Sequence, residues 1–410
     1  MEKDFSYSDV EDSYKENLYF DLINIIINIK VKNPQSGRNQ IYKIKKVKCN
    51  YDNDTNNDLK KKVEGIVNDI NTKMNFDISK YQNNWSLFYL YKEILQKLNR
   101  DYNFSRGQCT DWPMLPGLIR KNTNAELKNN FELNYKDIMY RYPNLIEYFP
   151  PLSHRENINK REQQLAHLQH YGMKTSLIDI TENPFIAMLF MVSDTNSKDF
   201  EFATLDLFNI NQEIHDKNNL FSKVKQLNTN QRIIAQKGAF LNFDKVILTT
   251  STPSKVDKIP LIRIRLNIKF NHLKKIKEEL NHKRKEYKKL EKDYESYINN
   301  LNNDADSQGI PKELKENLRN MIDARSKVIK LKEQTSSLEE YYKDIVLSRI
   351  RIDIKNKLSE YHYTEKQLYP DLYKHIQYVE SEYIEKRQNK HAKSENVEVV
   401  STKEKIADFL

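Results

Sequence analysis

Glycine is the residue that this sequence lacks most clearly. It has 7 glycines in 410 residues, whereas an average composition holds about 7% glycine. The few glycines in such a chain are expected at positions where the backbone requires them. Gly107, Gly172 and Gly238 each stand in a segment rich in polar side chains. We therefore expect these three segments to form one site.

Cysteine is scarce too, because Cys49 and Cys109 are the only two. Two thiols cannot build a disulfide framework or a zinc site, so a reducing cytoplasm is the expected compartment. His154, His167 and His170 lack cysteine or glutamate partners at metal-binding spacings. We therefore expect no metal.

Long apolar runs are missing from the sequence as well. The longest, residues 184–192, is far shorter than the ~20 residues that span a bilayer. The acidic and polar residues 1–14 do not resemble a signal peptide, so we expect no membrane association. The 68 basic and 58 acidic residues give a net charge of +10. The two signs are interspersed, which excludes a simple basic tail protein.

The N-terminal region is expected to hold a β-hairpin and a helix. Alternating isoleucines predict a strand over residues 20–32 with one buried face, and residues 40–49 predict its return strand. Between Lys30 and Lys48 there are seven Lys or Arg residues and no acid. Such a hairpin can contact nucleic acid. The simpler expectation is a solvated face whose edge lysines oppose aggregation.

A short strand is predicted over residues 101–108, after an amphipathic helix over residues 84–98. The strand ends in an Arg-Gly pair, Arg106 and Gly107. An arginine at a strand end can hold a phosphate or a carboxylate with two hydrogen bonds. It can equally form a structural salt bridge to a helix residue such as Glu162.

Residues 169–184 carry the densest group of polar side chains, between two apolar segments. Gly172 is typical of the left-handed residue that ends a helix. Asn183 and Pro184 fit an N-cap and a first-turn proline. The helix that follows is apolar almost all round, so we expect it to be buried. A short strand is expected between the two helices.

The polar residues in this segment allow two interpretations. They can line a cleft, or they can satisfy one another inside the fold. His170 can cap carbonyl groups at the helix end, and Asp179 and Thr181 can cap the next helix. Gln236 can likewise pair with the backbone of a bulge.

Further strands are predicted over residues 200–207, 238–243, 246–250 and 260–268. Together these elements predict an α+β fold, in which helices flank a mixed or antiparallel sheet. Heptad-like seams over residues 273–301 and 321–345 predict an inserted antiparallel helical hairpin about 45 Å long. Such an arm can bind a protein partner or self-associate, but packing of its two seams on each other is the simpler interpretation.

Taken in order, these segments resemble the FRG domain family. The family's five motifs stand here as Phe104-Ser105-Arg106-Gly107-Gln108, Leu115-Pro116 with Arg120, Gln169 to Pro184, Arg232 through Gln236 and Gly238 to Phe240, and Leu368-Tyr369-Pro370-Asp371-Leu372. Ser105 is an insertion relative to the family, Ser176 stands where the family often has Arg, and Ile180 where it often has Trp. The resemblance covers about residues 84–268 and 355–379.

The expected division of the chain follows from this resemblance and from the predicted arm. The regions are an N-terminal hairpin and helix at 1–80, the first part of the FRG-like domain at 81–270, the inserted hairpin at 271–348, a closing FRG-like segment at 349–380, and a polar tail at 381–410.

The FRG motif order is similar to that of ADP-ribosyltransferases, which implies a related fold and NAD as the substrate. The catalytic residues implied by this resemblance are Arg106, Tyr171, Thr175, Asp179 and Gln236. Those implied in binding the dinucleotide are Arg106, Gly107, Gln108, His170, Tyr171, Thr175, Ser176 and Asn183. Because the reaction passes through a cationic state and Gln236 is neutral, Asp179 or Glu182 would have to supply the negative charge.

Two classes of function are therefore expected. One is an enzyme of the ADP-ribosyltransferase or NAD glycohydrolase type, acting as a toxin or antiphage effector, because FRG-like proteins resemble components of bacterial and phage conflict systems. The other is a non-catalytic module that binds a nucleotide or macromolecule, with the arm carrying a partner.

Overall fold

The computed structural model describes residues 6–31, 42–52, 55–80, 86–98, 100–151, 155–193, 202–223, 238–246, 256–269, 274–301 and 312–365. Four predictions lie wholly or mostly outside these residues. They are the strand at 246–250, the role of Gln236, the closing motif at 368–372 and the polar tail at 381–410.

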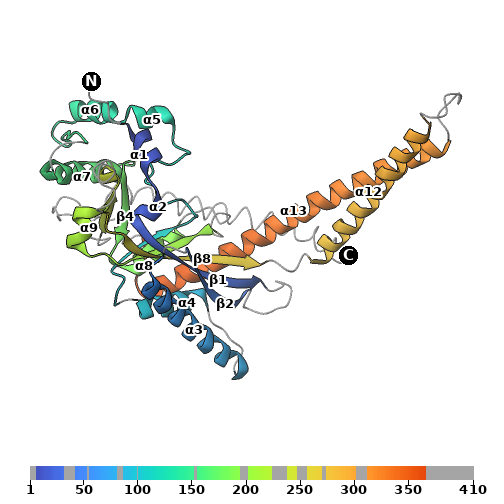
Figure 1. The fold of residues 1–410 in the computed structure, drawn as a ribbon, viewed down its shortest axis with the longest axis horizontal. Helices are drawn as coiled ribbons and strands as arrows, with labels where there is room; N and C mark the ends of the chain where they lie inside the picture. Colours follow the sequence, from blue (N-terminus) through green and yellow to red (C-terminus); the bar gives the residue numbers. More distant parts are fainter. Residues whose placement is uncertain are drawn as a thin grey trace.

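One eight-stranded sheet organises the fold, with the strand order β2-β1-β8-β5-β3-β4-β7-β6 (Figure 1). Only the β1–β8 pair is parallel, so the sheet is mixed, and the predicted α+β class is confirmed. The strands are β1 (Phe20–Val31), β2 (Tyr42–Tyr51), β3 (Phe104–Gln108), β4 (Leu177–Thr181), β5 (Thr204–Phe208), β6 (Phe221–Ser222), β7 (Gly238–Asn242) and β8 (Ile259–Lys269).

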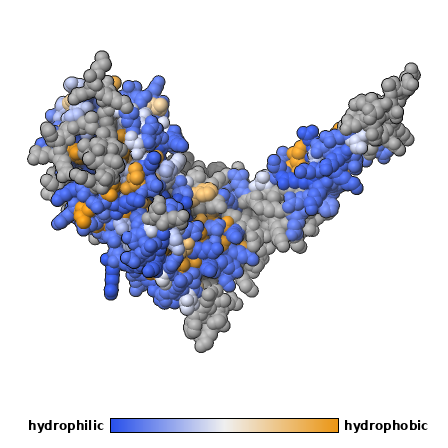
Figure 2. All heavy atoms as spheres, viewed as in Figure 1, coloured by the Kyte–Doolittle hydropathy of each residue, from blue (hydrophilic) through white to orange (hydrophobic). Residues whose placement is uncertain are grey.

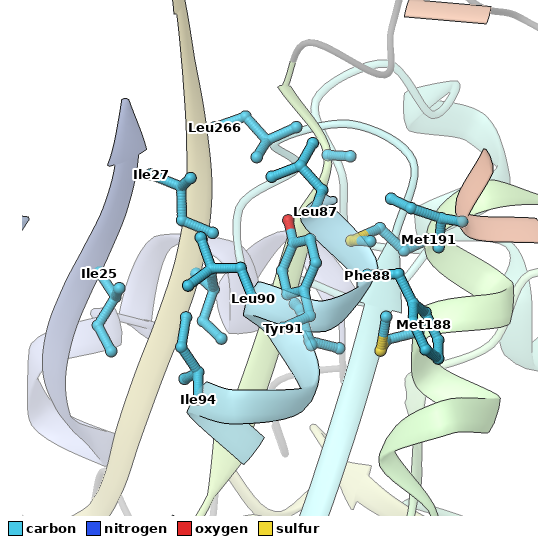
Figure 3. Packing of buried hydrophobic residues seen from close by; sticks show 14 of the residues in the cluster. Ile25, Ile27, Leu87, Phe88, Leu90, Tyr91, Ile94, Met188, Met191 and Leu266 are labelled. Carbon is cyan, nitrogen blue, oxygen red and sulfur yellow. The ribbon is translucent and has the colours of Figure 1, made fainter. Parts of the chain in front are cut away.

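The predicted alternation in β1 is confirmed, because Ile23, Ile25, Ile27 and Ile29 are all at most 1% exposed. These side chains bury one face of the sheet against four helices, α3 (Asn57–Lys80), α4 (Leu87–Leu98), α8 (Pro184–Val192) and the C-terminal part of α13 (Lys312–Glu360). Figure 3 shows α4 between this face and α8, with Tyr91 and Phe88 filling the space.

A second apolar cluster lies on the other face of the sheet. Residues from α1 (Tyr7–Ser13), α5 (Ala125–Asn129), α6 (Phe131–Arg141) and α7 (Arg155–His170) pack there on β4 and β7. The short helix α2 (Glu16–Tyr19) lies between α1 and β1, and the short helix α9 (Gln212–Asn218) connects β5 to β6. Arg161 of α7 is 1% exposed and joins these elements, because it binds Glu132, Asp244 and the Tyr7 hydroxyl.

The helix α12 (Lys274–Leu301) lies beside the outer part of α13, and the two project away from the sheet (Figure 1). The visible face of this arm is mostly hydrophilic (Figure 2). By contrast, Val346, Leu347, Ile350, Ile354 and Leu358 of α13 are at most 1% exposed and belong to the core. No helix in the described ranges is both long and apolar enough to cross a bilayer.

This burial pattern predicts that the outer arm can be removed. Deleting Lys274 to Asp344 and joining the ends with a short glycine linker should leave a soluble protein whose unfolding midpoint changes little, because the part of α13 that belongs to the core begins at Val346. Thermal unfolding followed by circular dichroism measures this.

The matched comparison is Ile350→Ala in the full chain. It should cost about 2–5 kcal/mol, because it opens a cavity in the core. Insoluble protein after the arm deletion would show that α12 and the outer part of α13 are required for the core to fold.

Candidate functional site

The sheet splits between β3 and β4. The two strands share one residue pair, Ser105 with Thr181, while β3 pairs with β5 along its whole length and β4 does the same with β7. Beyond that single pair, β3 and β4 diverge around a cavity of about 490 Å³. Main-chain groups on the two facing strand edges are therefore available to a ligand, in addition to the side chains.

The end of α7 forms one wall of the cavity. Gly172 has φ +94°, as expected for a residue that terminates a helix. Its N–H donates to the Gln169 carbonyl at 3.0 Å, and the Met173 N–H donates to the Leu168 carbonyl at 3.1 Å, the two bonds that stop a helix at such a glycine. This turn leads the chain from Gln169 to Thr175 along the cavity.

Gly107 is required because α8 approaches β3 very closely. A Cβ atom at this position would lie 1.7 Å from the Ala187 carbonyl oxygen and 2.9 Å from the Met191 nitrogen. The start of α8 is fixed as predicted, because the Asn183 side chain accepts a hydrogen bond from the Phe185 N–H at 3.0 Å and Pro184 occupies the first turn. Gly107 thus serves helix packing, and only its backbone borders the cavity.

Arg106 is a nearly buried cation that its neighbours compensate only in part. Its side chain is 10% exposed, and Nη1 lies 3.9 Å from Asp206 Oδ2 and 3.6 Å from Met114 Sδ. Arg263 binds Asp206 more closely, at 2.7 Å from its Nε. Burial lowers the pKa of Arg106 to about 10, so the side chain remains charged at neutral pH. Because Arg106 lines the cavity, its other N–H groups can bind an anion there.

Thr175, Gln169 and Asp179 form a hydrogen-bonded chain on the opposite wall. The Thr175 hydroxyl donates to Gln169 Oε1, and Gln169 Nε2 donates to Asp179 Oδ2 at 2.8 Å. This arrangement fixes the glutamine amide and orients the carboxylate at the cavity edge. The negative charge of Asp179 also stabilises the charged form of Arg106, so the two side chains are close enough to interact electrostatically.

The loop after β3 supplies a third wall with one cation, Arg120, and one aromatic ring, Trp112. Lys174, from the turn after α7, lies beside this loop. The Arg120 guanidinium lies 5.1 Å from the centre of the Trp112 ring, and its Nε donates to the Leu115 carbonyl at 3.0 Å. Lys174 reaches the Thr123 hydroxyl at 3.3 Å. Arg106, Arg120 and Lys174 face a single lining carboxylate, Asp179, so the described cavity wall favours an anionic ligand.

Gln108 adds a neutral polar group to the β3 wall. The side chain is 7% exposed, and its Nε2 donates to the Trp112 carbonyl at 3.1 Å. Its Oε1 is buried and has no hydrogen-bond partner within the described part of the chain.

Several predicted site residues lie away from the cavity. Tyr171 is 58% exposed, stacks edge-on with His167 and His170, and is not among the described residues that line the cavity. Neither His170 nor Glu182 lines the cavity. Gln236 lies outside the described residues.

The remaining assignments are explained by local structure. Ser176 is fully buried beside the Tyr7 hydroxyl, and Asn183 caps α8 and binds the Tyr363 hydroxyl at 3.1 Å. The alternative salt bridge between Arg106 and Glu162 is also wrong, because Glu162 instead accepts a hydrogen bond from Asn242 at 3.0 Å. Burial raises the pKa of Glu162 to about 7.

Sequence reasoning missed two further residues that border the cavity. Trp112 and Lys174 line the cavity, yet neither was singled out from the sequence. A tryptophan among prolines, close to Arg120, was the available signal.

Comparison with known families matches residues 101–200 to the FRG domain. This range contains Arg106, Gly107, Thr175 and Asp179, so the cavity is formed largely by the matched segment. No curated protein and no solved structure matches the chain.

The contact at Gly107 predicts a large effect for a small substitution. Gly107→Ala should lower the free energy of unfolding by about 3 kcal/mol or more, because helix and strand backbones cannot both keep their places. Gly65→Ala is the matched control, since a Cβ there meets nothing within 4 Å.

In the exposed interior of α3, alanine should be neutral or stabilise by up to ~1 kcal/mol. Urea unfolding of both variants measures the difference. A Gly107→Ala protein as stable as the wild type would contradict the close approach of α8 to β3.

Proposed function

We propose that the FRG domain of this chain binds NAD or a closely related nucleotide in the cavity between β3 and β4. The observation that supports this most strongly is Arg106, a nearly buried guanidinium that lines the cavity and has only long contacts, to Asp206 and Met114, among the described residues. An anionic group there would form charge-assisted hydrogen bonds with a planar fork, a geometry that suits phosphate. The cavity of about 490 Å³ is within the range of small-molecule sites, about 300–1,000 Å³.

The walls suit the different parts of a dinucleotide. Arg106, Arg120 and Lys174 supply cations for phosphates, and Trp112 and Phe240 supply aromatic surfaces for a base or the nicotinamide ring. The amide of Gln169 lines the cavity and can form hydrogen bonds with ribose hydroxyls. In this proposal Trp112 takes the stacking role that the sequence resemblance gave to Tyr171.

The proposed reaction is of the ADP-ribosyltransferase or NAD glycohydrolase type. The bond between nicotinamide and ribose breaks, and nicotinamide leaves with the bonding electrons. Water or an acceptor nucleophile then adds to the ribose carbon and releases a proton. Asp179 is the cavity carboxylate that would stabilise the cationic ribose, and Gln169 holds it in position.

Binding without turnover is the second candidate function. The observation that favours it is the hydrogen bond from Gln169 to Asp179, which takes up part of the carboxylate's acceptor capacity. Since Gln236 is neutral, a second carboxylate would have to come from another residue. The site would then recognise a nucleotide as a signal.

The fold of the sheet, the arm and the biological role are part of the same proposal. We propose that the split sheet is a variant of the ADP-ribosyltransferase fold, and that α12 with the outer part of α13 is an inserted antiparallel hairpin for a protein partner or self-association. The effector role in bacterial or phage conflict predicts that expression slows host growth and that Arg106→Ala relieves this.

Arg106→Lys and Asp179→Asn separate binding from turnover. Arg106→Lys should weaken NAD binding at least tenfold, because lysine keeps the charge but loses the bidentate fork. Asp179→Asn should keep affinity within about threefold yet reduce nicotinamide release by about 100-fold or more. Calorimetry measures the affinity and chromatography measures nicotinamide.

Arg141→Lys is the control, because Arg141 is 70% exposed on α6. Full affinity in Arg106→Lys would refute the anion site. If the wild type binds NAD but releases no nicotinamide, the second candidate function, binding without turnover, is favoured.

A further inference from the structure

The three strands at the β2 end of the sheet place basic residues side by side on one face. Side chains of directly paired residues lie on the same face of a sheet. The pairing of β2, β1 and β8 gives four rows across this face, Lys43–Lys30–Lys269, Lys46–Asn28–Asn267, Lys48–Ile26–Arg265 and Asn50–Asn24–Arg263. We call these twelve positions the basic sheet face. Seven are Lys or Arg, four are Asn, and none is acidic.

The lysines of this face have no carboxylate partners in the described ranges. Arg263 is bound by Asp206 and Glu16, and Arg265 is 2.9 Å from Asp111. No ion pair between residues that the structure describes involves the five lysines, which are Lys30, Lys43, Lys46, Lys48 and Lys269. Four of them are exposed, and Lys43 is half-buried.

Like charges directly opposite each other destabilise a sheet. The row Lys43–Lys30–Lys269 therefore costs stability. Protection of the sheet edge does not explain this cost, because of these three strands only β2 lies at the edge and β8 is two strands further in. An edge is protected by lysines on the outermost strand alone. A polyanion bound across the rows would remove the repulsion.

The basic sheet face continues toward the cavity. Arg265 pairs with Thr204 of β5, and Thr204 pairs with Gln108 of β3. In the next row, Arg263 of β8 pairs with Asp206 of β5, and Asp206 pairs with Arg106 of β3. From β2 to β3 this path crosses four strand spacings, about 19 Å. Asp111 and Trp112, in the loop after β3, lie between the exposed lysines and the cavity.

We propose that the basic sheet face binds a single-stranded nucleic acid through its phosphates. A row of lysines on a flat sheet can follow a flexible backbone without reading its sequence. A single strand can also present one unpaired nucleotide to the cavity, which a base inside a duplex cannot reach; this last step rests on the function proposed above. The surface itself does not depend on what the cavity binds.

The composition of the face favours nucleic acid over an anionic membrane. Proteins that lie on membranes combine basic residues with large apolar side chains that insert among the lipids. The basic sheet face carries four asparagines and one half-buried isoleucine, and no aromatic residue. Asparagine amides can contribute hydrogen bonds to phosphate and sugar groups.

Fluorescence anisotropy with a labelled 20-nucleotide single-stranded DNA and the full chain tests the proposal between about 50 and 300 mM NaCl, across which phosphate-mediated binding weakens steeply. The triple variant Lys46→Glu, Lys48→Glu, Lys269→Glu should bind at least tenfold more weakly. The slope of log K against log salt should become shallower by about 2, because about 0.7 is lost per phosphate contact on a single strand.

The control triple variant Lys61→Glu, Lys330→Glu, Lys332→Glu changes the net charge equally at exposed sites on α3 and α13. It should change the affinity less than threefold. If the first variant fails to fold by circular dichroism, glutamine at the same three positions replaces it, with an expected loss of at least threefold.

Wild-type binding that is absent or insensitive to salt would overturn the proposal, as would equal losses in the two triple variants. Binding to vesicles rich in phosphatidylserine but not to the oligonucleotide would assign the surface to membranes instead. NAD affinity should be the same in the wild type and both variants, so failure here is distinguishable from failure of the proposed nucleotide site.

Discussion

The single residue pair between β3 and β4 is the constraint on which the rest of the site depends. If the ladder continued beyond Ser105 and Thr181, the two strands would close against each other and leave no space for a ligand. Each strand is instead held on its outer edge, β3 by β5 and β4 by β7. The close contact of Gly107 with α8 fixes β3 from behind. The split is therefore built into the pairing of a continuous sheet.

Electrostatics gives this split its chemical character. A buried charge is costly unless it is paired, and the sheet pairs Asp206 mainly with Arg263, leaving Arg106 with a weaker contact at 3.9 Å. A ligand that brings negative charge completes the arrangement. The same face of the sheet continues into lysines on β8, β1 and β2 that have no ion pair with any described residue. Both proposed anion sites, the cavity and the basic sheet face, therefore lie on one face of the sheet.

Much of the local structure could be predicted from the sequence, because its signals are local. Gly172 ends α7, Asn183 and Pro184 begin α8, and the alternating isoleucines of β1 face the core. The reason for Gly107 could not be predicted in this way, since it is a contact with Ala187, 80 residues later. For the same reason the alternative of a structural salt bridge from Arg106 named a residue on α7, whereas the acidic neighbour, Asp206, lies on β5.

Hydrogen exchange with and without NAD tests the central claim most directly, that the split between β3 and β4 holds the nucleotide. Saturating NAD should slow exchange in peptides that cover residues 104–109 and 177–181, because the ligand contacts both strand edges. Peptides from the outer arm should not change. Protection confined to other regions, with NAD shown to bind, would contradict this account.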